Sequence, residues 1–231
     1  MNEQWFLLGD IHGSAQPVHY FYQKNKERLS LDSSENYMIL LGDVGANFAL
    51  TGQRDHKFKS ELSKLPFTFI CLRGNHEARV KTVIDKNPDS WETISKYDGS
   101  IFVEKEFPHI EYLADGPAVY NFKSYKTLSL PGAYSVDKYY RQARHLTWYK
   151  ELGRKLCRNE APFDLVLSHT CPYLYEPTDL FLAGLDQSTV DSTMERYLGE
   201  IEFNLDYKRW IFGHFHADRL YPWADGRQML M

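Results

Sequence analysis

Several common sequence features are scarce in this chain of 231 residues, and each scarcity excludes some classes of protein. The three cysteines, Cys71, Cys157 and Cys171, are odd in number and irregularly spaced, which favours a reducing compartment over a disulfide framework. No apolar run approaches the roughly 18 residues that a membrane helix needs. The N-terminus lacks a basic segment followed by a long apolar one. We therefore expect no signal peptide, no membrane association and a cytoplasmic location.

Positive charge is scarce as well. Lys and Arg total 27 against 31 Asp and Glu, which gives a formal net charge of -4 at pH 7. This charge balance lacks the excess of basic residues that is typical of nucleic-acid-binding proteins. A small nucleotide is still compatible with it, because a pair of metal ions can supply positive charge locally. Repeats, low-complexity tracts and linkers are missing too, so we expect a single domain over residues 1–231; the sequence does not indicate the oligomeric state.

The first third of the chain alternates short apolar runs with segments of helical periodicity. The runs predict strands over residues 5–8, 37–41 and 67–72. Helices are predicted by three apolar stripes: Val18, Phe21, Tyr22 and Leu29; Phe58, Leu62 and Leu65; Val80, Val83 and Ile84. This alternation is typical of parallel β-α-β units.

The middle of the chain differs, because its apolar runs are short and broken by Pro and Gly. Residues 101–103, 109–113, 118–122 and 127–130 predict a second, antiparallel-leaning sheet. The remaining predicted elements are a helix over 146–157, a strand over 165–167, a helix from an N-cap at Ser188 to near Gly199, a strand over 209–212 and a hairpin around Asp225 and Gly226. Two packed sheets flanked by helices are the simplest α/β architecture for this order.

Metal-binding residue types gather directly after five of the predicted strands. The clusters are Gly9-Asp10-Ile11-His12-Gly13, Gly42-Asp43, Gly74-Asn75-His76-Glu77, Ser168-His169 and Gly213-His214-Phe215-His216. Parallel sheets bind ligands beyond the carboxyl ends of their strands. Residues two apart, such as Asp10 and His12, point the same way in an extended chain, so each such pair can serve one site. Mixed imidazole, carboxylate and amide donors suit Mn, Fe, Zn, Co or Ni better than calcium, and a phosphate-ester hydrolase is favoured.

In their order along the chain, these clusters resemble the calcineurin-like metallophosphoesterase superfamily. Its pattern is Gly-Asp-x-His, Gly-Asp, Gly-Asn-His-Asp/Glu, a lone His and Gly-His-x-His, and the match covers residues 9–216. The resemblance implies a four-layer α-β-β-α sandwich of two mixed sheets and two divalent metal ions, with manganese favoured. It further implies that one metal is held by Asp10, His12 and His216, that the other is held by Asn75, His169 and His214, and that Asp43 bridges them.

The resemblance also assigns chemistry to two residues. Two divalent ions facing two carboxylates leave about two net positive charges, which favours a phosphate group and lowers the pKa of a bridging water. Asp43 and His76 are therefore the expected catalytic residues of a hydrolysis by metal-activated hydroxide. His76 is expected to protonate the leaving oxygen or to stabilise the transition state. Glu77 is expected to be structural.

The chain departs from the phosphoprotein phosphatase branch, which carries Gly-Asp-x-x-Asp-Arg. Here Ala46 cannot accept a hydrogen bond from His76, and Asn47 can donate to a phosphate but has no charge and no guanidinium fork. Two arginines are further candidates for phosphate binding. For Arg73 the favoured alternative is a structural salt bridge, whereas Arg141 lies in a segment, 131–141, that resembles one from an uncharacterised bacterial and phage-type branch of the superfamily.

These observations favour a dinuclear metal-dependent phosphoesterase acting on phosphate mono- or diesters, with a small molecule or nucleotide as substrate. One alternative is a serine/threonine-type protein phosphatase with an atypical phosphate anchor. A second alternative is a non-catalytic, metal-stabilised binding protein. The sequence does not decide the natural substrate.

Overall fold

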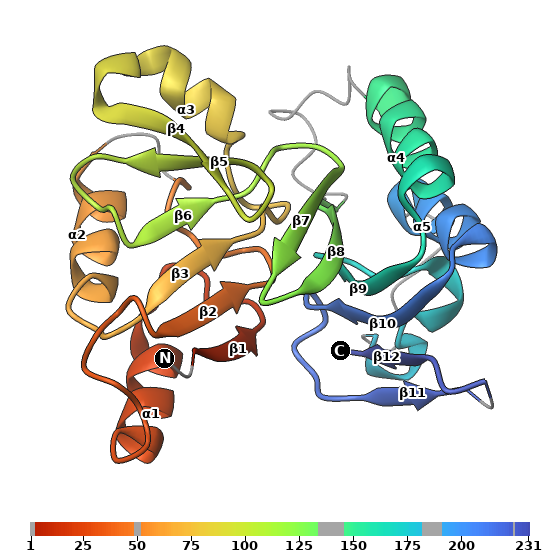
Figure 1. Cartoon of the computed structure of the whole chain (residues 1–231), viewed down its shortest axis with the longest axis horizontal. Coiled ribbons are helices and arrows are strands. Elements are labelled where there is room, and N and C mark those ends of the chain that lie inside the picture. Colours follow the sequence, from red (N-terminus) through yellow and green to blue (C-terminus); the bar gives the residue numbers. More distant parts are fainter. Residues whose placement is uncertain (1–2, 49–51, 134–145, 182–190, 224) are drawn as a thin grey trace.

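Two mixed sheets lie face to face in this protein, and helices cover their outer faces (Figure 1). The computed structural model describes residues 3–48, 52–133, 146–181, 191–223 and 225–231. The four-layer α-β-β-α sandwich implied by the resemblance is confirmed. That residues 1–231 form one domain stays a prediction.

The first sheet has six strands in the order β1-β2-β3-β6-β5-β4. Their bounds are β1 (Gln4–Leu8), β2 (Asn36–Leu40), β3 (Thr68–Cys71), β4 (Trp91–Lys96), β5 (Gly99–Glu104) and β6 (Ile110–Tyr112). Strands β1, β2, β3 and β6 pair in parallel, and β5 and β4 continue the sheet in antiparallel pairing.

The second sheet also has six strands, in the order β11-β12-β10-β9-β8-β7. Their bounds are β7 (Ala118–Phe122), β8 (Tyr125–Leu130), β9 (Phe163–Ser168), β10 (Tyr207–Phe212), β11 (Leu220–Pro222) and β12 (Gln228–Leu230). Strands β8, β9, β10 and β12 pair in parallel, and β7 and β11 close the two edges in antiparallel pairing. The hairpin predicted around Asp225 and Gly226 is confirmed as the β11–β12 pair.

Five α-helices are described on the outer faces of the sheets. They are α1 (Gln16–Asn25), α2 (Gln53–Leu62) and α3 (Val80–Lys86) on the first sheet, and α4 (Leu146–Glu160) and α5 (Thr193–Asn204) on the second. Short 3-10 turns are η1 (Pro88–Ser90), η3 (Tyr173–Tyr175) and η4 (Thr178–Leu180). No helix of the described ranges combines the length and the apolar character needed to cross a bilayer.

The period-two alternation of strand side chains separates the layers. On β2, Met38 and Leu40 pack with the helices, whereas Tyr37 and Ile39 join a core cluster shared with the second sheet. Both faces are therefore buried, which explains why the strand reads as a continuous apolar run. Strand β1 was expected to be buried as well, but it lies at the sheet edge and leaves Leu7 40% exposed.

The prediction that the four middle runs form a second, antiparallel-leaning sheet is confirmed for the last two runs and wrong for the first two. Residues 99–104 and 110–112 extend the first sheet as β5 and β6, while 118–122 and 125–130 begin the second as β7 and β8. A short apolar run predicts a strand but does not predict the neighbouring strand with which it pairs, because that pairing depends on long-range packing. Strand β4 was missed because only Trp91 of its residues is buried.

The last helix also differs from its prediction. Helix α5 begins at Thr193, after Ser192, and the expected N-cap, Ser188, lies outside the described residues. The helix continues past Gly199 to Asn204 because its buried apolar face extends to Ile201.

Candidate metal centre

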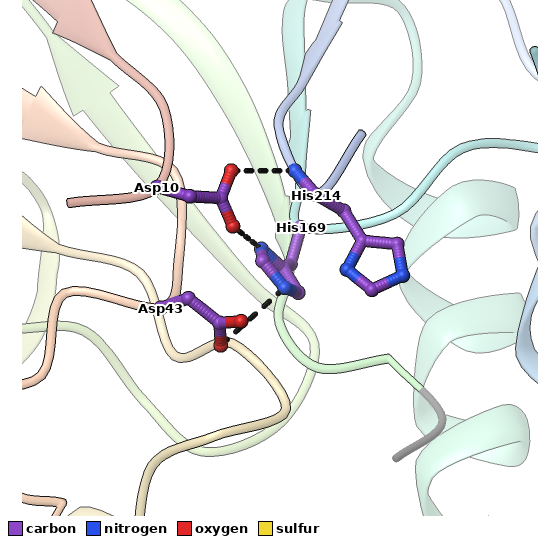
Figure 2. A group of neighbouring side chains, drawn as sticks. All are labelled: Asp10, Asp43, His169 and His214. Carbon is purple, nitrogen blue, oxygen red and sulfur yellow. Dashed lines mark hydrogen bonds and ion pairs between the residues drawn. The ribbon is translucent and has the colours of Figure 1, made fainter. Parts of the chain in front are cut away.

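The five motif clusters meet where the carboxyl ends of the parallel strands of both sheets converge. Asp10, Asp43 and Asn75 follow β1, β2 and β3 of the first sheet, whereas His169 and His214 follow β9 and β10 of the second. Figure 2 shows the two carboxylates on one side of the His169 ring. The backbone N–H of His214 donates to Oδ2 of Asp10 over 2.6 Å, so the two sheets are joined directly at this point.

Six of the seven predicted metal ligands fall into two groups of donor atoms. One group is Asp10, Asp43, His169 and His214, the other is Asp10, His12 and His216, and the donor atoms within each group lie within 4.8 Å of one another. The seventh, Asn75, places its Oδ1 2.9 Å from Nε2 of His169. Asp10 belongs to both groups, whereas Asp43 belongs to one. The bridging role of Asp43 therefore stays a prediction.

His169 is fully buried and held in one orientation. Its Nδ1 lies 2.8 Å from the carbonyl oxygen of Leu41, which can only accept, so the ring N–H is at Nδ1. Nε2 then faces two acceptors, Oδ1 of Asn75 at 2.9 Å and Oδ1 of Asp43 at 3.5 Å. The Leu41 carbonyl was missed at the sequence level, because a backbone atom leaves no residue signal.

The charges around His169 raise its pKa. Burial alone would lower the pKa of His169, but the hydrogen bond and negative charge of Asp43, together with Asp10, outweigh it and raise this pKa above the ordinary 6.5. Burial likewise would raise the pKa of Asp43, and His169 and His76 instead hold it well below its usual range. His214 behaves differently, because burial lowers its pKa to about 3.

Asp43 is also the charged group that faces His76. Its Oδ1 accepts the backbone N–H of His76 over 2.9 Å, and its Oδ2 lies 3.9 Å from Nε2 of the ring. The His76 side chain is 36% exposed and its ring lies 5.6 Å from that of His12. The sequence did not identify which residue contacts His76, and the structure shows that Asp43, itself a candidate metal ligand, is one such residue.

The expectation that residues two apart serve one site holds for Asp10 and His12, which share a donor group. It is wrong for His214 and His216, and the extended backbone expected for these pairs is not found. Left-handed φ values occur at His12 (46°), Asp43 (47°), His214 (74°) and His216 (53°). Such conformations cost on the order of 1 kcal/mol each in non-glycine residues and cluster at functional sites. Tight turns, rather than period-two alternation, therefore aim these side chains, and His214 and His216 fall into different groups.

The sequence profile of the calcineurin-like phosphoesterase family matches residues 6–218. The chain belongs to this family. Its membership indicates hydrolase activity, and it accounts for the order of the five clusters along the chain.

Solved structures agree with calcineurin-like phosphoesterase membership at the level of the fold. One crystal structure has a TM-score of 0.58 at 14% identity, with 100% of this chain and 90% of that chain covered. TT1561 of Thermus thermophilus has a TM-score of 0.56 at 10% identity, with coverages of 100% and 89%. A comparison with curated proteins gives no match.

Calcineurin-like phosphoesterases typically hold two divalent metal ions, and the residues here fit such a pair. Oδ1 of Asp10 is buried and accepts no hydrogen bond from the described part of the chain. The lone pair of a neutral His169 at Nε2 would oppose two oxygen acceptors. A cation among these atoms would satisfy all of them.

Two of the three residues predicted to bind the phosphate, Asn47 and Arg73, are not part of the two donor groups. Asn47 is only 5% exposed. The Arg73 guanidinium donates to the carbonyl oxygens of Gly74 (3.2 Å) and Asp115 (3.4 Å) and lies 3.5 Å from the Asp115 carboxylate, so the structural salt bridge is present. Arg141 lies outside the described residues. Phosphate binding by these three residues stays a prediction.

Glu77 links the two loops that carry Asp43 and Asn75. Its buried carboxylate accepts the backbone N–H of Gly45 over 2.7 Å and that of Gly74 over 3.0 Å. It is not part of either donor group, so the structural role expected for it agrees with its position.

Replacing Glu77 with Gln should weaken metal binding about 10- to 100-fold, because one backbone N–H would then face an amide NH2 instead of an acceptor. Titration of the metal-free protein with Mn²⁺ measures this. Glu111→Gln is the matched control, since Glu111 is an equally buried carboxylate bonded to Lys96 (2.5 Å) and Tyr97 (2.7 Å), away from the centre. Equal metal affinities of the two variants would contradict the positioning role.

Gly74→Ala should also weaken metal binding, by about tenfold or more, because a Cβ at residue 74 would collide with the backbone nitrogen and Oδ1 of Asp43. Gly199→Ala on α5 is the control, since a Cβ there meets nothing closer than 3.9 Å and alanine favours a helix. Inductively coupled plasma analysis of both purified variants gives the metal content. A fully loaded Gly74→Ala protein would refute the steric argument.

Metal binding should release a proton from His169 at neutral pH. The raised pKa increases the fraction of this imidazole that is protonated in the metal-free protein, and a cation at Nε2 displaces that proton. The His169–Asp43 attraction stabilises the metal-free fold fully below pH 6.5 and is lost as the pH rises through the raised pKa.

Calorimetric titration in buffers of different ionisation enthalpy measures this release, which should decline as the pH rises. His214, with a pKa of about 3, should contribute nothing. Identical proton release from the wild type and from His169→Asn would contradict the assignment.

Proposed function

We propose that this calcineurin-like phosphoesterase hydrolyses small phosphate mono- or diesters with two divalent metal ions bound at the converging strand ends. The observation that supports this most directly is the pair of donor groups that share Asp10, beside the half-exposed ring of His76. A phosphate ester needs a positive site that can clamp its oxygens and a proton source for its leaving group, and this arrangement offers both.

When bound, the metal pair would supply charge stabilisation of the phosphate oxygens and a nucleophile at neutral pH. Asp10, His12 and His216 would hold one ion, whereas Asn75, His169 and His214 would hold the other together with Asp43. Hydrogen bonds within the protein orient these donor groups before a metal binds. The His214 N–H fixes one oxygen of Asp10, the Leu41 carbonyl fixes the His169 tautomer and the His76 N–H fixes one oxygen of Asp43.

His76 would hold and deliver the proton that the leaving oxygen requires. Its backbone N–H donates to Asp43, which places residue 76 beside the donor groups. Its side chain is still 36% exposed, so a substrate oxygen can reach it. Oδ2 of Asp43 lies 3.9 Å from Nε2, so a carboxylate faces this nitrogen of the ring.

A small ester is favoured over a phosphoprotein. The protein phosphatase branch uses a charged arginine where this chain has Asn47, and Asn47 is buried. The nearby Arg73 is engaged with Asp115. The cytoplasmic location and the preference for manganese belong to this proposal as well.

An ester panel tests the proposal. The metal-free protein, reconstituted with Mn²⁺, Zn²⁺ or Fe²⁺, should hydrolyse p-nitrophenyl phosphate or its bis-ester and should act poorly on a phosphopeptide. Asp10→Asn should lose about 100-fold or more of kcat/KM, because Asp10 contributes to both groups. Metal binding without turnover of any ester would favour a non-catalytic protein, and preference for the phosphopeptide would favour the protein phosphatase alternative.

His76→Asn should lower kcat about 100- to 10,000-fold for an alkyl phosphate, whose leaving oxygen needs a proton. The loss should be clearly smaller for p-nitrophenyl phosphate, because its leaving group departs as a stable anion. The control is His109→Asn, an exposed histidine whose ring contacts Ser33. Equal losses for both leaving groups would exclude proton donation by His76.

A further inference from the structure

We propose, on the premise that the centre hydrolyses phosphate esters, that Phe48 and Arg54 bind the group attached to the scissile phosphate. The substrate class would be esters whose attached group carries an aromatic ring and a further negative charge, the combination found in nucleotides. Phe48 follows the loop of Asp43 and lies next to His76, and Arg54, in the first turn of α2, lies next to Phe48.

Phe48 is an exposed ring placed against the proposed proton donor. It is 42% exposed. Its ring centroid lies 6.4 Å from that of His76, with the planes inclined by 40°. A group leaving next to His76 would therefore emerge beside an aromatic surface, on which a ring can stack.

Arg54 adds positive charge to the same surface. Its guanidinium carbon lies 5.8 Å from the centroid of the Phe48 ring, and the residue is exposed. Arg54 occupies the first turn of α2, where the helix dipole disfavours a cation. Asp55 stands in the same turn. The exposed guanidinium of Arg54 would in addition pair with a ligand that carries negative charge beyond its ring.

The combination selects a chemical class. An aliphatic phosphate could use the metal centre but would gain nothing from Phe48, and a neutral aryl phosphate would gain nothing from Arg54. A ring that carries an anionic substituent would use both. Asn47, Arg73 and Arg141 are candidates for binding the phosphate itself. Phe48 and Arg54 would instead contact the group attached to it.

Non-hydrolysable phosphonates separate binding from leaving-group chemistry. Inhibition constants of methylphosphonate, phenylphosphonate and 4-carboxyphenylphosphonate would be measured on the Mn²⁺-loaded protein during p-nitrophenyl phosphate hydrolysis. Phenylphosphonate should bind about 5- to 100-fold more tightly than methylphosphonate. Phe48→Ala and Phe48→Leu should remove most of this ratio, whereas Phe48→Tyr should keep it. The same ratio should persist in Leu31→Ala, which changes an exposed apolar residue elsewhere.

The contribution of Arg54 is measured by the ratio of the inhibition constants of phenylphosphonate and 4-carboxyphenylphosphonate. 4-Carboxyphenylphosphonate should bind about threefold more tightly than phenylphosphonate, a preference that Arg54→Gln removes and Arg54→Lys retains. Unchanged ratios in the Phe48 and Arg54 variants, with hydrolysis intact, would overturn the proposed surface and leave the proposed function standing. Absence of metal-dependent phosphonate binding and of all ester hydrolysis would overturn both.

Discussion

The buried imidazole of His169 is the contact on which the centre depends. It follows a strand of the second sheet, yet its Nδ1 is held by the carbonyl of Leu41 and its Nε2 faces Asn75 and Asp43, all from the first sheet. This crossing fixes the spacing of the two sheets at the strand ends. The hydrogen bond and negative charge of Asp43, together with Asp10, raise the pKa of His169 against the effect of burial, so a proton at Nε2 and a cation compete for the same place.

Around this imidazole, hydrogen bonds from the loops restrict the side-chain conformations of the candidate ligands. The N–H groups of His214 and His76 each hold one carboxylate oxygen, and Glu77 ties the loops of Gly45 and Gly74 together. Left-handed backbone at four of the ligand positions is part of the same arrangement. Membership of the calcineurin-like phosphoesterase family gives this preorganised cluster a chemical context, and the half-exposed His76 beside it motivates the hydrolytic proposal.

Much of the site could be anticipated because each cluster directly follows its strand, and parallel strands deliver their carboxyl ends to one edge. The geometry within the clusters could not. His214 and His216 were expected to share a direction, but left-handed turns send them to separate groups. The middle strands were assigned to a sheet of their own, since periodicity describes the faces of a strand and not its neighbours. Strand β4 was not predicted because its residues after Trp91 are mostly polar and largely exposed.

The sequence by itself determined the class of the fold, the family and the seven candidate ligands, because these depend on local residue types in a fixed order. Only the tertiary structure decided that Asp10 belongs to both donor groups, that Asp43 faces His76, that Arg73 pairs with Asp115 and that Phe48 lies next to both His76 and Arg54. These facts join residues that are distant along the chain or depend on the direction of a turn. Such relations arise from packing, which no local pattern records.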